Sequence, residues 1–320
     1  MARWPVTGVD LDAAQVAAVL ELAERATAAD GIAPLSEHVL LHLRYDSAVP
    51  DSAVPDSAGP DSAGPDDAGP DPRPHRDVVV TVDGEIAGYA YLDPPEPEVS
   101  GELVVDPARR RQGIGQALVR ALMAEANGHT LQLWAHGDTP AATSLAGRMG
   151  FERFRALWQL HRSLHDQLGQ PDVPAGITLR TFVPGQDEEE WLGLNGRAFA
   201  KHPEQGAWTR HDLDVREQEP WFDPAGFFVA ERDGRMAGFH WTKVHPQGTG
   251  EVYVVGVDPG EQGSGLGRAL TLTGLRHLRE LGLGQAMLYV DEDNRPAIRM
   301  YEALGFTRAR TDAMYRWRQH

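Results

Sequence analysis

The stretch 251–267, E-V-Y-V-V-G-V-D-P-G-E-Q-G-S-G-L-G, combines two residue types that can do chemistry together. Its apolar, β-branched first half predicts a strand that Asp258-Pro259 ends. A glycine-rich loop follows and leads into a helical pattern. Glycines let backbone N–H groups approach a phosphate closely, and a helix start adds partial positive charge. The stretch therefore predicts an anion-binding loop, with the carboxylate of Glu251 on the same strand as a candidate base.

The elements that must position this loop occur twice in the chain. Residues 82–91 match 232–241, residues 104–118 match 256–270, and residues 146–151 match 301–306. The spacing from Asp106 to Gly113 equals that from Asp258 to Gly265. We interpret the pattern as a duplicated unit that mixes strands and helices, and so predict an α/β protein of two similar domains.

The expected domains are 1–165 and 177–320, joined by the polar, Pro- and Gly-rich linker 166–176. Periodicity and turn signals predict the individual elements. Strands are expected at 78–82, 85–92, 103–105, 130–135, within 152–164, and at 177–181, 227–231, 235–243, 251–257, 286–290 and 313–318. Helices are expected at 11–29, 37–45, 116–127, 139–149, 187–200, 208–217, 268–281 and 296–304.

An acidic insert interrupts the first domain. Residues 46–70 are five tandem pentapeptides from DSAVP to DDAGP, with proline at every fifth position. Proline forbids a helix, and the other residues are too small and polar to form a core. We expect 46–76 to be a disordered, partly extended loop.

Composition excludes several classes of function. The formal net charge of -17 is opposed to binding of nucleic acid or of an anionic membrane surface. The chain has no cysteine, no apolar run long enough to span a membrane, and no apolar segment of a signal peptide at its start. We expect a soluble, cytoplasmic monomer. The histidines show no metal spacing, since His161 and His165 lack a third partner nearby, and no metal is expected.

At these motifs the chain resembles the GCN5-related N-acetyltransferase (GNAT) family. The carrying patterns are the loop 262–267 after a strand and the N-x-x-A-x-x-x-Y-x-x-L-G-F run at 294–306. The resemblance implies a bent, mixed sheet with splayed central strands that admit acetyl-CoA. The implied acetyl-CoA contacts in the second domain are Val255, Gly256, Val257, Gln262, Gly263, Ser264, Gly265, Leu266, Gly267, Arg268, Asn294, Arg295, Pro296, Ala297, Ile298 and Arg299. Those in the first domain are Leu103, Val104, Val105, Arg111, Gln112, Gly113, Ile114, Gly115 and Gln116.

A closer resemblance extends over most of the chain. The stretches A-D-G-I-A-P-L-S-E-H, R-A-F-A-K-H-P-E-Q-G-A-W-T and F-H-W-T-K-V-H-P are similar to those of tandem GNAT enzymes that acetylate the amine of a cysteinyl-glucosaminyl-inositol. This resemblance implies that Glu37, Glu204, Lys243, Glu251 and Tyr289 contact that small-molecule substrate. From the residues alone, Glu37 is as well explained by the dipole of its helix, and Lys243 by solvation at the surface.

Acetyl transfer to an amine defines two catalytic roles. The α-amino group, with a pKa near 8, must lose a proton, and Glu251 is the candidate base. A backbone N–H near Val255 would stabilise the developing oxyanion. Tyr301 stands at the family's usual acid position and would protonate the departing thiolate. The alternatives are a solvated carboxylate at a strand end for Glu251 and a core aromatic residue for Tyr301.

The first copy lacks both groups. Alignment on Asp106 and Asp258 places Val99 opposite Glu251, and alignment on Phe151 and Phe306 places Ala146 opposite Tyr301. We expect the first domain to bind acetyl-CoA without catalysing transfer. Two rival functions remain open, which are acetylation of another small amine such as an aminoglycoside and a non-catalytic acyl-CoA sensor.

Overall fold

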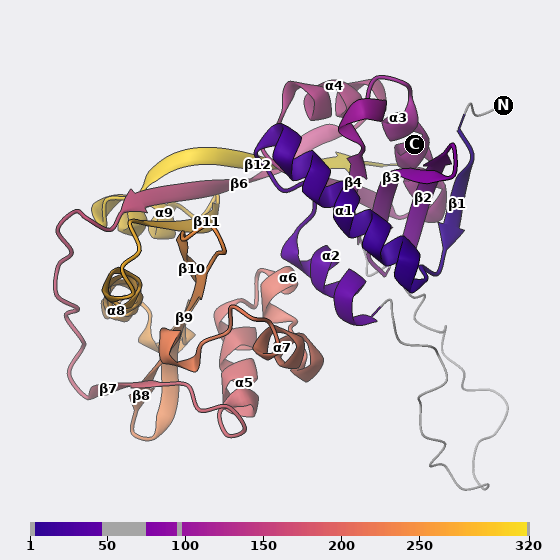
Figure 1. Cartoon of the computed structure of the whole chain (residues 1–320). Coiled ribbons are helices and arrows are strands. Elements are labelled where there is room, and N and C mark those ends of the chain that lie inside the picture. The colour runs from indigo at the N-terminus through magenta and orange to yellow at the C-terminus, as the bar shows by residue number, and fades with distance from the viewer. Residues whose placement is uncertain (1–3, 47–74, 95–97, 319–320) are drawn as a thin grey trace, which may run out of the picture. The chain divides into compact units, whose positions relative to one another are not determined.

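The computed structural model describes residues 4–46, 75–94 and 98–318 (Figure 1). The chain divides into two compact units, the first Met1–Ala156 with Thr311–His320 and the second Leu157–Arg310. Almost all of the predicted acidic insert 46–76 lies outside the described residues. The observed division differs from the predicted one, because it falls within a strand and returns the end of the chain to the first unit.

The first unit contains a mixed sheet in the order β1-β2-β3-β4-β5-β12. All its neighbouring strands are antiparallel except β4 and β5, which are parallel. Its strands are β1 (Val6–Val9), β2 (Arg76–Val82), β3 (Glu85–Leu92), β4 (Glu98–Val105), β5 (Thr130–Ala135) and the end of β12 (Thr307–Trp317). Strand β1 was not predicted, because four residues with a central glycine carry too little alternation to mark a strand.

Helices cover both faces of this sheet. On one face, α1 (Ala13–Asp30) and α2 (Glu37–Leu41) pack against Val79, Tyr89 and Val104. On the other, α3 (Ile114–Glu125) and α4 (Pro140–Arg148) pack against alternate residues such as Val78 and Val80. Caps fix where the first two helices begin, since Asp12 forms a capping box and Ser36 accepts from the Val39 N–H.

The second unit repeats the plan with the sheet order β6-β11-β10-β9-β8-β7. Among the described residues, β10 and β11 are parallel and the other neighbouring strands of this sheet are antiparallel. Its strands are the end of β6 (Glu152–Ser163), β7 (Ile177–Thr181), β8 (Phe227–Arg232), β9 (Arg235–Val244), β10 (Gly250–Val257) and β11 (Gln285–Asp291). Its helices are α5 (Glu188–Ala198), α6 (Pro203–Gly206), α7 (Arg210–Glu217), α8 (Leu266–Glu280) and α9 (Arg295–Ala303).

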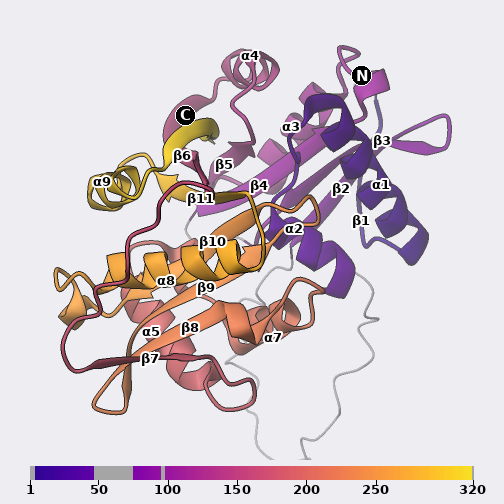
Figure 2. The ribbon, with the colours of Figure 1, turned by 60° about the vertical axis from the view of Figure 1, so that its left-hand side comes forward.

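The core of the second unit also has two faces. Trp191 of α5 and Leu213 of α7 pack with Phe227, Phe239 and Trp241 on one face. Helix α8 packs on the other face against β9 and β10, as Figure 2 shows. Each unit is therefore a mixed sheet between helices, as the duplicated sequence predicts.

The two units exchange the strands that end the two halves of the sequence. The end of β12 pairs with β5 from Ala313–Ala135 to Trp317–Leu131, and Ala313 and Tyr315 are buried in the first core. The end of β6 pairs instead with β11 from Leu157–Asp291 to Ser163–Gln285. Each unit thus obtains its sixth strand from the segment that the sequence assigned to the other. Periodicity marks a strand but not its partner, so this exchange could not be predicted.

Candidate active site

The loop between β10 and α8 has the backbone geometry of an anion site. Asp258 accepts from the Gly260 N–H and receives Arg197 at 2.9 Å, which fixes the turn that precedes the loop. Gly263 (φ +80°) and Gly265 (φ +91°) adopt the left-handed conformation that favours glycine. Gly265 begins α8 without a side-chain cap. The Leu266 N–H, the first of α8, donates to Ser264 Oγ at 3.4 Å, and the N–H groups that follow it suit a phosphate.

Strands β10 and β11 separate beside this loop. Among the described residues their pairing is confined to Gly250–Ala286 and Glu251–Met287. Beyond Glu251 the β11-facing edge of β10 has no ladder partner, and Val255, Gly256 and Val257 follow on that strand. An unpaired edge of this kind can receive an extended ligand as an added strand. The wedge that opens at Glu251 therefore offers the free edge of β10 to an extended ligand.

Glu251 lies at the apex of the wedge. Its side chain is 9% exposed, and a hydrogen bond of 2.7 Å joins Glu251 Oε2 to His245 Nε2. Glu251 is the cross-strand neighbour of Lys243 on β9 and of Met287 on β11. Burial contradicts the alternative of a solvated carboxylate at a strand end.

Lys243 lies in an aromatic cage. Its Nζ is 4.3 Å from the ring centre of Trp221 and 5.1 Å from that of Tyr253. The side chain is buried, which contradicts the alternative of a solvated surface lysine. Tyr253 reaches the cage because a β-bulge at Val252–Val254 leaves it as an extra residue in β10, and its hydroxyl accepts from Arg216 Nε at 2.9 Å.

Tyr301 lies in α9 and is buried in the second core. Its ring meets Phe306 edge-on at 5.7 Å, so the alternative of a core aromatic residue describes part of its role. Burial raises the pKa of its hydroxyl well above the usual value, which keeps it protonated. Among the described residues this hydroxyl has no hydrogen-bond partner, yet it is not one of the fully buried polar atoms, so it reaches the surface of the protein. A proton donor without a protein partner that a ligand can reach suits a group that acts on that ligand.

The start of α9 lies next to the separated strands in the sequence. Asn294 caps the helix by accepting from the Ala297 N–H at 3.2 Å. The cap accounts for Asn294 locally and orients the first turn, which holds the predicted contacts Arg295, Pro296, Ala297, Ile298 and Arg299.

The remaining predicted substrate residues are spread over three elements. Tyr289 on β11 is 42% exposed, and its hydroxyl accepts from Gln159 Nε2 at 2.9 Å. Glu204 is exposed on the short helix α6, where its carbonyl accepts from Trp208 Nε1. Glu37 lies in the first turn of α2 in the first unit, so the second unit by itself brings together Glu251 and Lys243 but not Glu37.

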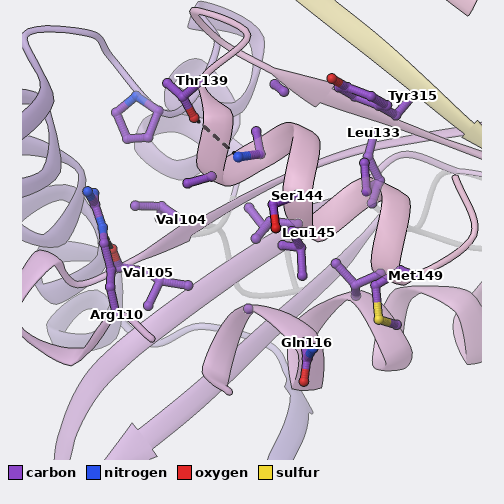
Figure 3. Close-up of a pocket in the computed structure, with 18 of the residues that line it drawn as sticks. Val104, Val105, Arg110, Gln116, Leu133, Thr139, Ser144, Leu145, Met149 and Tyr315 are labelled. Atoms are coloured by element: carbon purple, nitrogen blue, oxygen red, sulfur yellow. Dashed lines mark hydrogen bonds between the residues drawn. The ribbon is translucent and has the colours of Figure 1, made fainter. Parts of the chain in front are cut away.

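The first unit holds a pocket of about 890 Å³ at the equivalent place (Figure 3). Eight of the nine residues predicted to contact acetyl-CoA there line it, with Gln112 the exception. Strands β4 and β5 separate after Gly101–Leu133, and the pocket continues between Val105 of β4 and Leu145 of α4.

The loop of the first unit repeats the geometry of the second. Gly113 (φ +96°) begins α3 without a side-chain cap, and Trp4 donates to the Gln112 carbonyl. Arg111 (φ +64°) stands where the second loop has Gly263, a position that costs a side chain roughly 1–2 kcal/mol. Arg110 forms a bidentate pair with Asp30 at 2.7 Å. The first unit therefore retains an anion-binding loop at some cost in strain.

A charged histidine faces this first pocket. His136 lies between Glu102, at 3.4 Å, and Asp312, at 3.2 Å. Burial opposes a charge on the ring, but the two carboxylates outweigh it and raise the pKa of His136 to about 10. His136 lines the pocket and is thus a cation at neutral pH.

The first unit has no counterpart of the candidate acid and base. Phe151 N donates to the Ala146 carbonyl as Phe306 N donates to that of Tyr301, so Ala146 occupies the equivalent position. The predicted counterpart of Glu251, Val99, is wrong by one residue. The β9–β10 bulge adds a residue in the second unit, and strand pairing makes Ser100 the counterpart. Neither Ser100 nor Ala146 can supply the missing chemistry.

Sequence reasoning missed two features of this site. His245 follows β9 directly and makes the hydrogen bond to Glu251, and Tyr253 enters the cage through the bulge. The only sequence signal for His245 is its place in the V-H-P stretch directly after a predicted strand.

The helices of the described ranges include none that is long and apolar enough to cross a membrane.

Known proteins resemble this chain along its whole length. Residues 195–306 match the Acetyltransferase (GNAT) family, and residues 74–153 match an Acetyltransferase (GNAT) domain. Mycothiol acetyltransferase of Thermomonospora curvata is 55% identical over 94% of this chain and 93% of its own. That of Thermobispora bispora is 54% identical over 93% of this chain and 95% of its own.

Solved structures share the fold. A tandem GNAT protein from the clavulanic acid biosynthesis pathway superposes with a TM-score of 0.70 at 22% identity, over 99% of this chain and 98% of its own. A GCN5-related N-acetyltransferase from Sphaerobacter thermophilus gives 0.64 at 24%, over 99% and 96%. With two GNAT domains and relatives this similar over nearly the whole length, the chain belongs to the mycothiol acetyltransferase family of GNAT enzymes.

Proposed function

We propose that the chain transfers the acetyl group of acetyl-CoA to the cysteinyl amine of 1D-myo-inositol 2-(L-cysteinylamino)-2-deoxy-glucopyranoside, which yields mycothiol. The observation that carries the chemistry is the buried Glu251 at the apex of the separated strands, beside an uncapped phosphate loop. The choice of substrate rests on the similarity to mycothiol acetyltransferases. The proposal includes a cytoplasmic, monomeric enzyme that uses no metal for transfer.

Glu251 acts as the base in this proposal. The acceptor amine is mostly protonated at neutral pH, since an α-amino group has a pKa near 8. Glu251 takes one proton from the ammonium, directly or through one water, so that the neutral amine can attack the thioester carbon, and the second proton that the nitrogen loses on forming the amide passes to solvent. The His245 Nε2–H donates to the Glu251 carboxylate at 2.7 Å when the carboxylate is charged, which orients it and compensates for its burial.

Two other groups complete the transfer. A backbone N–H near Val255, on the unpaired edge of β10, donates to the oxygen that gains negative charge. The Tyr301 hydroxyl gives its proton to the departing thiolate and recovers one from solvent or product. Burial raises the pKa of this hydroxyl, so it is protonated when the thiolate forms.

The acceptor is held by the same wedge. Lys243 is the cross-strand neighbour of Glu251 and presents a cation beside it, which suits hydroxyl groups of a sugar or inositol. Tyr289, Glu204 and Glu37 are the further proposed contacts. They offer a phenol and two carboxylates to a substrate rich in hydroxyl groups.

The first unit is proposed to bind acetyl-CoA without turning it over. Its pocket, uncapped α3 and charged His136 support binding of an anion and an acyl chain. The absence of catalysis follows from Ser100 and Ala146 at the positions of base and acid.

The test is acetyl transfer by the purified chain to the cysteinyl pseudodisaccharide. We expect Glu251→Gln to lower kcat by roughly 10²- to 10⁴-fold with little change in the KM for acetyl-CoA, because it removes the base and keeps the shape. Tyr301→Phe should lower kcat by a smaller factor, since a thiolate with a pKa of about 8.5 leaves without full protonation. The exposed Glu280 on α8 supplies a control, Glu280→Gln, with unchanged rates.

Two results would contradict the proposal in different ways. Turnover of an aminoglycoside without turnover of the cysteinyl compound would replace the substrate and retain the chemistry. Undiminished rates in Glu251→Gln and Tyr301→Phe would reject the assigned roles and retain the substrate.

A further inference from the structure

A cluster of two histidines and an aspartate lies in the first unit, apart from the pocket. It comprises His42, His75 and Asp77, whose potential ligand atoms all lie within 4.8 Å of one another. The Nε2 atoms of both imidazoles are directed at one carboxylate oxygen, Asp77 Oδ2, at 3.5 Å from His42 and 3.7 Å from His75. His42 and Asp77 are buried, while the side chain of His75 is 33% exposed.

These separations suit a tetrahedral transition metal. Imidazole nitrogens and carboxylate oxygens bind Zn²⁺ at about 2.0–2.2 Å, so neighbouring ligand atoms of a tetrahedron lie roughly 3.4 Å apart. The two N–O distances exceed this value by 0.3 Å at most. The half-exposed His75 leaves one side of the cluster accessible to a water as the fourth ligand.

The second oxygen of the aspartate is held in place by the protein. Asp77 Oδ1 accepts from the Tyr89 hydroxyl at 2.6 Å, and Tyr89 is fully buried in β3. Such an outer hydrogen bond orients a ligating carboxylate and leaves its other oxygen for the metal.

A strand and a π-helical turn place the three ligands. Asp77 is the second residue of β2, and His75 precedes that strand. His42 begins a turn of π-helix, His42–Asp46, that directly continues α2. A π-helical turn is rare and occurs frequently at functional sites, because it redirects side chains that a regular α-helix would place elsewhere.

The geometry points to a binding site for one divalent transition metal, with Zn²⁺ as the preferred ion, formed by His42, His75 and Asp77. The donor set of two imidazoles and one carboxylate favours Zn²⁺ or Co²⁺ over Mg²⁺ and Ca²⁺, which take oxygen ligands. The sequence predicts no metal because His42 and His75 stand far apart along the chain. The fold brings them together.

Bound metal would join the two ends of the segment between His42 and His75. Closing a chain of this length has an entropic cost, which the ligand bonds offset in the folded state. The metal would also fix the end of the helix whose first turn carries Glu37. Its role is structural, since neither the base Glu251 nor the acid Tyr301 belongs to this unit.

Metal binding by the full chain without a histidine tag tests the site. We expect one equivalent of Zn²⁺ after equilibrium dialysis and a rise in Tm with Zn²⁺ that chelator reverses. Co²⁺ in its place should give the intense visible absorption of tetrahedral coordination. His75→Gln should weaken Co²⁺ affinity at least tenfold, and it should still fold because His75 is half-exposed.

Two further variants distinguish a metal-binding site from an ion pair between the histidines and the aspartate. Tyr89→Phe should lower the affinity by roughly 10- to 100-fold although Tyr89 is no ligand, which a simple ion pair of His and Asp does not predict. His129→Gln changes an exposed histidine of the same unit and should leave binding unchanged. Less than 0.2 equivalents of Zn²⁺ in the wild type, or equal Co²⁺ spectra in the wild type and His75→Gln, would overturn the proposal.

Discussion

At the scale of single residues, burial determines what Glu251 can do. A carboxylate on a side chain that is 9% exposed needs a hydrogen-bond donor, and His245 supplies it at 2.7 Å. The carboxylate could be chosen from the sequence, because the duplication shows that one copy has it and the other does not. The histidine could not, because it approaches through the turn after β9 and not through a spaced motif.

His245 therefore gives a prediction at this scale. His245→Ala removes a hydrogen bond to a charged group, so kcat should fall by about 10- to 100-fold. The KM for acetyl-CoA should stay the same, since the phosphate loop is untouched. His245→Gln keeps a donor and should recover part of the rate. Steady-state kinetics measure this, and an equal loss in both variants would argue against a role for the hydrogen bond.

At the scale of elements, helix α8 approaches its sheet closely enough that one position must be glycine. A Cβ on Gly274 would lie 2.1 Å from His240 Cε1, and His240 on β9 is completely buried. Its Nδ1 pairs with the Leu270 carbonyl at 2.8 Å, so the ring cannot move aside without losing that bond. Burial lowers the pKa of His240 to about 4, which keeps the ring neutral between helix and sheet.

The contact between Gly274 and His240 predicts the effect of substituting the glycine. Gly274→Ala should lower the free energy of unfolding by about 1–3 kcal/mol through overpacking, although alanine is the better helix former. Gly193→Ala in α5 is the matched control, because its Cβ would meet only the end of Arg197 at 3.5 Å. We expect that variant to be stabilised by about 0.5–1 kcal/mol. Urea unfolding followed by tryptophan fluorescence compares the two, and a more stable Gly274→Ala would contradict the packing argument.

At the scale of the whole molecule, the chain crosses from one unit to the other twice, after Ala156 and after Arg310. Residues after Arg310 return to the first unit, where Ala313, Met314 and Tyr315 are buried and Tyr315 lines the pocket. A fragment that ends at Leu164 would lack a strand of its own sheet. The proposal that the first unit does not catalyse transfer is therefore tested in the full chain with Glu251→Gln.

Because the end of β12 belongs to the first unit, truncation of the chain end should affect that unit. Removal of 311–320 should unfold the first unit and abolish its binding of acetyl-CoA, because it deletes core residues and one wall of the pocket. A chain that stops after Trp317 keeps the whole of β12 and should behave as the full chain. Calorimetry and the stoichiometry of acetyl-CoA binding measure the effect. Unchanged stoichiometry in the shorter chain would disprove the assignment of this strand.

The sequence by itself determined the duplication, the α/β class, both phosphate loops and the copy that carries Glu251 and Tyr301. These properties are local, since strand, glycine turn and helix are encoded by neighbouring residues whose periodicity and φ requirements show in one chain. Only the tertiary structure decided which strand completes each sheet, that a bulge makes Ser100 the counterpart of Glu251, and that His245 contacts the base. The same holds for the assembly of His42, His75 and Asp77. Such relations depend on contacts between segments far apart in the chain, and residue types alone do not specify which segments will meet.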